Sequence, residues 1–185
     1  LNKSYHKLGF QNGKGQTYEG ILTTSSIQMA QKYYDLLTRV KKGETSLEID
    51  EKIKQVLPDF PKFAITYSVT ENEEGSHVNQ QKMQQSLDNY NQMFGTKYDF
   101  SQIQGYNSNL NKRLARKDTK FKSRNEQLDL VIVVDRLLTG FDAPCLSTIF
   151  IDRQPMGPHD LIQAFSRTNR IFDKNKTYGQ IVTFQ

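Results

Sequence analysis

Five short apolar runs, separated by longer stretches with helical spacing of apolar residues, predict an α/β fold. The runs occupy residues 20–24, 63–69, 128–134, 146–151 and 179–184. The third run is almost continuously β-branched, which is typical of a strand covered on both faces of a parallel sheet. Strands that alternate with helices form right-handed βαβ units. We therefore expect a mostly parallel central sheet with helices on both faces.

Helix-end signals place helices between these strands. After the first strand, Ser25 or Ser26 can cap a helix, and Gly43, which follows two lysines, is typical of its end. Three more helices are expected at about 48–57, 78–94 and 110–122 from apolar spacing and from breakers such as proline.

Composition along the chain suggests one compact domain. At 185 residues the chain is long enough for one substantial core. Residues 1–18 are polar and punctuated by glycines, so we expect a leader or an interdomain connection there and a single domain over 19–185. Residues 75–127 are polar and rich in asparagine and glutamine, and we expect a helical, partly exposed and partly mobile segment.

The formal net charge of +5 favours a polyanionic partner, and the excess is local. Between residues 109 and 127 a basic run contains Lys112, Arg113, Arg116, Lys117, Lys120, Lys122 and Arg124. Such a run can grip DNA in a salt-sensitive manner, or it can be a solvated protein face. Both interpretations are open at this point.

Cysteine and histidine usage narrows the class of site. Cys145 is the single cysteine, so an intramolecular disulfide and a cysteine zinc site are both excluded. It lies beside an apolar run, which favours a buried thiol over a nucleophile. The three histidines are dispersed, so we expect no metal site. With no apolar run of transmembrane length, we expect a cytoplasmic protein with no membrane contact.

A glutamine and two arginines recur at offsets of four and seven near the C-terminus. On a helix, Gln163, Arg167 and Arg170 would lie within roughly sixty degrees of one another, because each residue turns about 100°. Paired guanidinium groups on a rigid helix suit phosphate oxygens. A solvated basic helix face is the alternative.

Polar residues also follow the expected strands at their carboxyl ends, where ligands gather in parallel sheets. Gly140 permits close approach of a ligand to the backbone, and Asp142 can accept a hydrogen bond from a hydroxyl group. Thr23, Thr24 and Ser25 offer hydroxyl groups and amides for phosphate contacts near a helix N-terminus. For the serine, a simple N-cap is the alternative.

Two motifs carry a family resemblance. Thr139-Gly-Phe-Asp-Ala-Pro144, followed by Gln163-Ala-Phe-Ser-Arg-Thr-Asn-Arg170, resembles motifs V and VI of superfamily 2 helicases and translocases. The particular residues of these two motifs are similar to those of the motor (R) subunit of type I restriction enzymes. Residues 20–34 resemble that subunit's motif IV region, and 66–74 resemble the strand and loop that follow it. The resemblance spans about 19–185.

The resemblance implies the second RecA-like lobe of an ATP-driven translocase, a three-layer domain with a mostly parallel central sheet. ATP and Mg²⁺ would be held mainly by the first lobe. It implies that Gly140 and Asp142 lie near the nucleotide and that Gln163 couples that site to DNA. Arg167 and Arg170 match the family's phosphate-contacting arginines, and we expect Arg170 to be the arginine finger.

The resemblance also implies partners. These are double-stranded DNA, the first RecA-like lobe and nuclease domain of the same polypeptide, and separate methyltransferase and specificity subunits. Thr139 is a further candidate for DNA contact, although many superfamily members have arginine at this position.

Residues 13–17 lack the order of a phosphate loop, and no acidic strand end suits a Mg²⁺ site or a nuclease. We therefore expect the isolated chain neither to hydrolyse ATP nor to cut DNA. Two alternatives remain: a lobe of another superfamily 2 translocase, and a non-catalytic DNA-binding module with a RecA-like fold.

Overall fold

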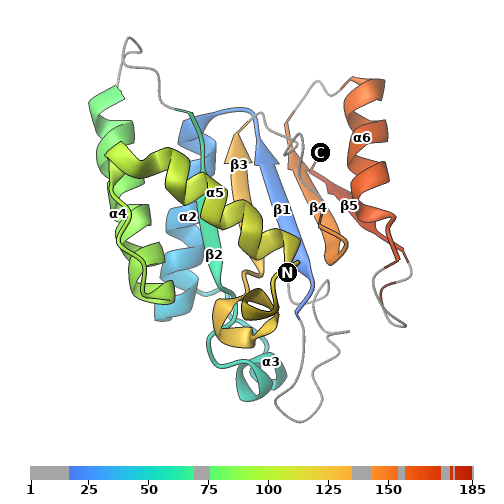
Figure 1. Cartoon of the computed structure of the whole chain (residues 1–185), viewed down its shortest axis with the longest axis horizontal. Coiled ribbons are helices and arrows are strands. Elements are labelled where there is room, and N and C mark those ends of the chain that lie inside the picture. The colour runs from blue at the N-terminus through green and yellow to red at the C-terminus, as the bar shows by residue number, and fades with distance from the viewer. Residues whose placement is uncertain are drawn as a thin grey trace.

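The five apolar runs form one parallel sheet (Figure 1). The computed structural model describes residues 17–68, 76–134, 143–153, 157–171, 176 and 178–184. Its strands are β1 (Glu19–Thr24), β2 (Phe63–Thr66), β3 (Leu130–Val134), β4 (Leu146–Asp152) and β5 (Gln180–Thr183). They are ordered β2-β3-β1-β4-β5, and every neighbouring pair is parallel. The predicted α/β architecture is confirmed.

The central strands end in register. Thr24, the last residue of β1, pairs with Val134 of β3 and with Asp152 of β4. The carboxyl ends of β1, β3 and β4 therefore form one edge of the sheet, as expected for a ligand-binding α/β domain. We refer to it as the carboxyl edge.

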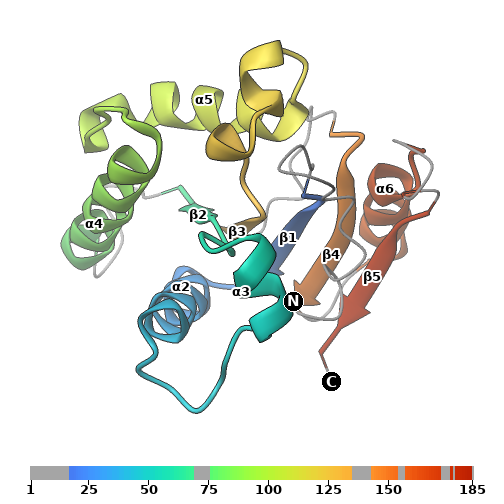
Figure 2. The ribbon, with the colours of Figure 1, turned by 90° about the horizontal axis from the view of Figure 1, so that it is seen from below.

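Helices cover both faces of the sheet (Figure 2). One face carries α2 and the other carries α5 and α6, as right-handed connections between parallel strands require, whereas α4 packs beside the edge strand β2. Their bounds, with the short α3, are α2 (Ile27–Lys42), α3 (Glu51–Val56), α4 (Ser76–Phe94), α5 (Ile103–Ala115) and α6 (Pro158–Thr168).

Both ends of α2 are capped by residues that the sequence predicted. Ser26 is the N-cap, and its hydroxyl group accepts a hydrogen bond from the amide of Met29 at 3.2 Å. Gly43 ends the helix with a φ of 72°, in the left-handed region that favours glycine. Of the two candidate serines, the second is therefore the cap, and Ser25 is left exposed.

The polar segment 76–127 contributes more to the core than its composition suggests. Helices α4 and α5 each bury one apolar stripe, which together consists of Met83, Leu87, Tyr90, Tyr106, Leu110 and Leu114. Because the outer faces are rich in asparagine and glutamine, the average composition of the segment is polar although one face is apolar. The helix expected at 110–122 is wrong in both bounds, because α5 begins at Ile103 and ends at Ala115.

Three arginines of the basic run lie inside the fold rather than on a DNA-facing surface. Arg116 is 4 % exposed and donates to Glu19 Oε1 at 2.9 Å. Arg124 donates to both carboxylate oxygens of Asp129, at 2.6 and 2.8 Å. Arg113 is 1 % exposed and stacks over the ring of Phe94 at 3.7 Å from its centroid. These three side chains hold the structure together. The lysines of the run are exposed.

The described part of the domain begins before the expected boundary at residue 19. Thr17 and Tyr18 are buried, and the carbonyl of Thr17 accepts a hydrogen bond from Arg116 Nη1 at 2.6 Å. These two residues therefore belong to the folded domain. The remainder of the expected leader, residues 1–16, lies outside the described residues.

Candidate functional site

Helix α6 is the element that carries the predicted polar motif. It begins with Gly157 as the N-cap and Pro158 in the first turn, a favourable position for proline because the first amides of a helix have no partner within it. It follows the carboxyl end of β4 and packs against β4 and β5. Ala164 and Thr168 are buried on its inner side.

Gln163 and Arg167 lie one turn apart on α6, as the sequence predicted, and both are half-buried. The side-chain amide nitrogen of Gln163 lies 2.8 Å from Nε2 of His159. The two side chains therefore form a hydrogen bond across one turn of the helix. His159 was not predicted as a member of this site, although its spacing of four residues from Gln163 was the available signal.

Arg170 does not share that helix. Helix α6 ends at Thr168, Asn169 is its C-cap, and Arg170 lies beyond it with an exposed side chain. The predicted three-residue stripe is therefore wrong in its last member. The hydroxyl group of Thr168 bonds back to the carbonyls of Ala164 and Phe165, and the carbonyl of Thr168 accepts from Lys176, so the helical hydrogen-bond ladder stops there.

The arginines also lie away from the carboxyl edge. Helix α6 starts near that edge and runs back along the sheet before β5 begins (Figure 1). Gly179, which directly precedes β5, packs against Thr168 at the end of the helix. The two arginines therefore lie toward the amino end of β5. We expected the whole motif to lie at the carboxyl edge, but only the start of α6 lies there.

The DNA-contact candidates of β1 differ in accessibility. Thr23 and Thr24 are 0 % exposed, because β1 is flanked by β3 and β4. The hydroxyl group of Thr24 donates to the carbonyl of Ser26 at 3.1 Å, so it serves the start of α2. The predicted contacts from the threonine hydroxyl groups do not fit this burial, whereas Ser25 is exposed and stays a candidate.

Three other candidates lie outside the described residues. Thr139, Gly140 and Asp142 belong to the segment that joins β3 to β4, and their assignments stay predictions. The description resumes at Ala143, which is buried, and continues with Cys145, which is fully buried. The Cys145 thiol donates to the carbonyl of Leu114 at 3.4 Å, and burial raises its pKa well above the ordinary value. The interpretation as a buried thiol is confirmed.

A tyrosine closes part of the carboxyl edge. The hydroxyl group of Tyr33 on α2 donates to Asp152 Oδ2 at 2.7 Å. Partial burial, reinforced by this hydrogen bond to a carboxylate, raises the pKa of Tyr33 to about 12. The tyrosine therefore stays neutral near pH 7, and this contact holds α2 against the end of β4.

Within the described ranges, no group of three or more histidine, cysteine, aspartate or glutamate side chains is arranged to hold a metal ion. None of the described helices is long and apolar enough to cross a membrane.

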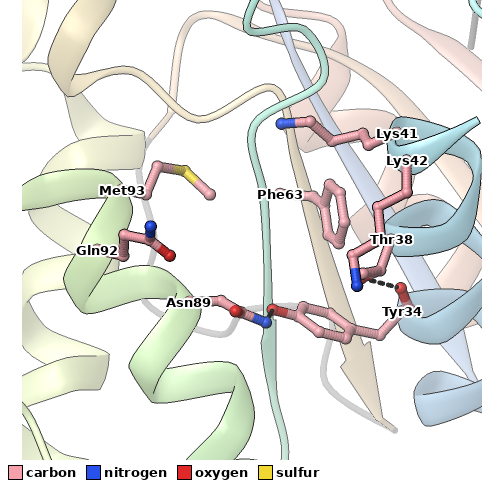
Figure 3. Close-up of a pocket in the computed structure, with 8 residues that line it drawn as sticks. All are labelled: Tyr34, Thr38, Lys41, Lys42, Phe63, Asn89, Gln92 and Met93. Carbon is pink, nitrogen blue, oxygen red and sulfur yellow. Dashed lines mark hydrogen bonds between the residues drawn. The ribbon is translucent and has the colours of Figure 1, made fainter.

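A cavity of about 400 Å³ lies between α2 and α4 and beside the edge strand β2 (Figure 3). Phe63 and Tyr34 line its interior, and Lys41 and Lys42 lie toward one end. Asn89 reaches across from α4 and donates to the hydroxyl group of Tyr34 at 3.1 Å. None of the predicted site residues lines this cavity. It lies beside β2 at one end of the strand order, whereas α6 packs on β4 and β5 at the other end.

Comparison with known proteins agrees with the two motifs. The sequence profile of the family "Type I restriction enzyme subunit R domain 3" matches residues 16–185. An endonuclease subunit from Staphylococcus aureus strain COL, "Type I restriction enzyme SauCOLORF180P endonuclease subunit", is 31% identical over 175 residues, which are 93% of this chain and 17% of that protein. The chain thus spans about a sixth of the length of such relatives.

Other matches cover a shorter stretch or have lower identity. A "Putative type I restriction enzyme MjaIXP endonuclease subunit" from Methanocaldococcus jannaschii is 49% identical over 65 residues, covering 35% of this chain and 6% of that protein. The solved structure "ATP-dependent Type ISP restriction-modification enzyme LlaBIII bound to DNA" aligns with 97% of this chain and 9% of its own, at 15% identity and a TM-score of 0.41. By the match over residues 16–185, the chain belongs to the family of type I restriction enzyme subunit R domain 3.

Proposed function

We propose that this domain is the second motor lobe of a type I restriction enzyme R subunit. In this role it supports ATP-dependent translocation of double-stranded DNA, which precedes cleavage by a nuclease domain elsewhere in the same polypeptide. The observation that carries the proposal is the end of α6, where Arg167 occupies the last turn and Arg170 is exposed directly beyond the helix. Family membership supplies the context for that geometry.

Two guanidinium groups so placed can serve phosphoryl transfer. Arginine is always charged and its forked donors match phosphate oxygens. Arg170, with an exposed side chain, would stabilise charge on the transferring phosphoryl group of a nucleotide held mainly by the first lobe, together with Mg²⁺. Arg167, on the rigid helix, would fix a neighbouring phosphate. An arginine finger of this kind contributes on the order of a thousandfold or more in rate.

The remaining nucleotide contacts are assigned to residues of motifs V and VI. Gly140 and Asp142 would lie near the ribose and phosphates, and Gln163 would connect the nucleotide site to the DNA track. The contact of Gln163 with His159 holds its side chain in one orientation in the present structure. Closure of the two lobes would have to preserve or replace that hydrogen bond.

DNA contact is proposed at the carboxyl edge. Ser25 is exposed there, and the backbone amides at the start of α2 can donate hydrogen bonds to a phosphate oxygen. Thr139 is a second candidate. The methyltransferase and specificity subunits would complete the enzyme. In this arrangement the isolated chain hydrolyses no ATP and cuts no DNA.

Replacement of Arg170 tests the proposal in the intact R subunit assembled with its partner subunits. Arg170→Ala should leave thermal stability nearly unchanged, because the side chain is exposed, yet it should abolish ATP-driven translocation, measured by displacement of a triplex-forming oligonucleotide. Lys52→Met, which removes an exposed charge on α3, is the matched control and should translocate normally. Near-normal translocation by Arg170→Ala would remove the finger assignment.

A further inference from the structure

A buried lysine holds the end of α6. Lys176 is only 3 % exposed, and its ammonium group donates to the carbonyl of Thr168 at 2.7 Å and also to the carbonyl of Arg170. These two carbonyls lie at the last residue of the helix and at the proposed finger. The lysine therefore ties the short segment 168–170 together from one side.

This contact is energetically meaningful for two reasons. The last carbonyls of a helix have no partner within it, and a cation there also complements the helix dipole. Burial of an ammonium group is costly unless its donors are hydrogen-bonded. Loss of these carbonyl contacts would therefore destabilise Lys176 as well as the end of the helix. The backbone that carries Arg170 out of the helix is fixed by this mutual requirement.

A glycine fixes the same segment from the other side. A Cβ atom at Gly179 would lie 2.1 Å from Cβ and 2.4 Å from the carbonyl oxygen of Thr168, far inside van der Waals contact. Thr168 itself is 1 % exposed. The chain entering β5 thus packs directly on the end of α6, and only glycine permits that approach.

We propose that Lys176 is a positioning residue for Arg170, and that Gly179 allows the close packing on which this positioning depends. Arg170 lies beyond the helix, so helical geometry does not set the direction of its side chain. The lysine sets the backbone at residue 170 instead, and through it the direction in which the guanidinium group leaves the chain. This inference rests on the proposed role of Arg170.

The test uses the intact R subunit with its partner subunits and DNA. Lys176→Met keeps the aliphatic length and removes every donor, Lys176→Arg keeps the charge and the donors, and Lys52→Met is the control. We expect Lys176→Met to lower kcat for DNA-stimulated ATP hydrolysis about 10- to 100-fold, as for a catalytic group displaced by about 1 Å, with KM for ATP changed less than about threefold. Lys176→Arg should recover most of the rate.

A double variant separates positioning from mere stability. If the lysine acts through the arginine, Lys176→Met combined with Arg170→Ala should be no slower than Arg170→Ala alone, as measured by single-turnover phosphate release. Multiplicative losses in the double variant, or a normal kcat in Lys176→Met, would overturn the inference. Should Lys176→Met fail to fold, Lys176→Gln, which keeps one nitrogen donor, is judged by the same two criteria.

The same experiment distinguishes the two levels of the proposal. Full activity of Arg170→Ala contradicts the proposed function itself. Loss of activity in Arg170→Ala together with a normal Lys176→Met contradicts only the positioning role.

Discussion

Arginines serve opposite purposes at two places in this domain. At the amino ends of β1 and β3, Arg116 is buried, and its guanidinium group donates to Glu19 and to the carbonyls of Thr17 and Leu128. At the end of α6, Arg170 is exposed and its backbone carbonyl accepts a hydrogen bond from the buried Lys176. The comparison teaches that density of charge in a sequence does not locate function. The arginines of the denser basic run contribute to structure, and the isolated pair supplies the candidate chemistry.

The largest expected difference between these regions is in stability. Arg116→Met leaves the carboxylate of Glu19 buried without its cation, which should lower the free energy of unfolding by about 3–5 kcal/mol. Arg170→Met should change it by less than about 0.5 kcal/mol, because exposed side chains contribute little. Urea denaturation of both variants measures the contrast. Lys112→Met on the exposed side of α5 is the control for charge removal. Equal stability losses at both arginines would break the comparison.

The stability contributed by the buried Glu19–Arg116 pair should also depend on pH. Burial raises the pKa of Glu19 to about 7, although Arg116 acts in the opposite direction. The folded protein then binds a proton that the unfolded chain releases near pH 4.5, so this group's contribution to stability falls as pH rises from about 4.5 to about 7. Glu19→Gln removes that dependence.

The measurement is the difference in unfolding free energy between Glu19→Gln and the unchanged chain. Between pH 5 and pH 7.5 this difference should move in favour of the variant by on the order of 2 kcal/mol. A difference that stays constant across this range would show that Glu19 is ionised throughout, and that Arg116 outweighs burial.

A smaller effect is expected at the packing contact on α6. Gly179→Ala places a methyl group against Thr168 and should cost about 1–3 kcal/mol. Gly105→Ala on α5 is the matched control, because its added Cβ would meet only the Tyr98 side chain at 3.4 Å, and alanine favours the helix by up to about 1 kcal/mol. If thermal unfolding shifts equally in the two variants, the close approach at Gly179 is not a constraint.

The smallest contrast is between two adjacent serines. Ser26→Ala removes the N-cap of α2 and should cost about 1 kcal/mol, whereas Ser25→Ala should leave stability nearly unchanged. DNA affinity of the intact enzyme should respond in the reverse sense, with a loss for Ser25→Ala. Stability loss at Ser25 instead would assign it to the cap and end its candidacy for DNA contact.

The sheet was predictable because the strands β1 to β4 are buried over most of their length, and β5, although partly exposed, is still a short apolar run. Continuous runs such as 128–134 have few alternative structures, and all five runs became strands. The motif pair was sufficient to predict the family. Helix ends were predictable where one residue makes the cap, as at Ser26 and Gly43.

Long-range partners were not predictable. Nothing in the local pattern around Arg116 indicates that Glu19, which is 97 positions away, completes its ion pair. The end of α6 at Thr168 likewise depends on Lys176 and Gly179, which follow a further segment of chain. Burial of the threonines in β1 required the strand order, which places β1 between β3 and β4.

Reconstitution with the first lobe tests the central claim most directly. The chain is mixed with a separately produced first lobe of the same R subunit, and DNA-stimulated ATP hydrolysis is measured against either part alone. We predict turnover only in the mixture, reduced on the order of a thousandfold when the chain carries Arg170→Ala. Hydrolysis in the mixture that is indifferent to both Arg167→Ala and Arg170→Ala would contradict the account.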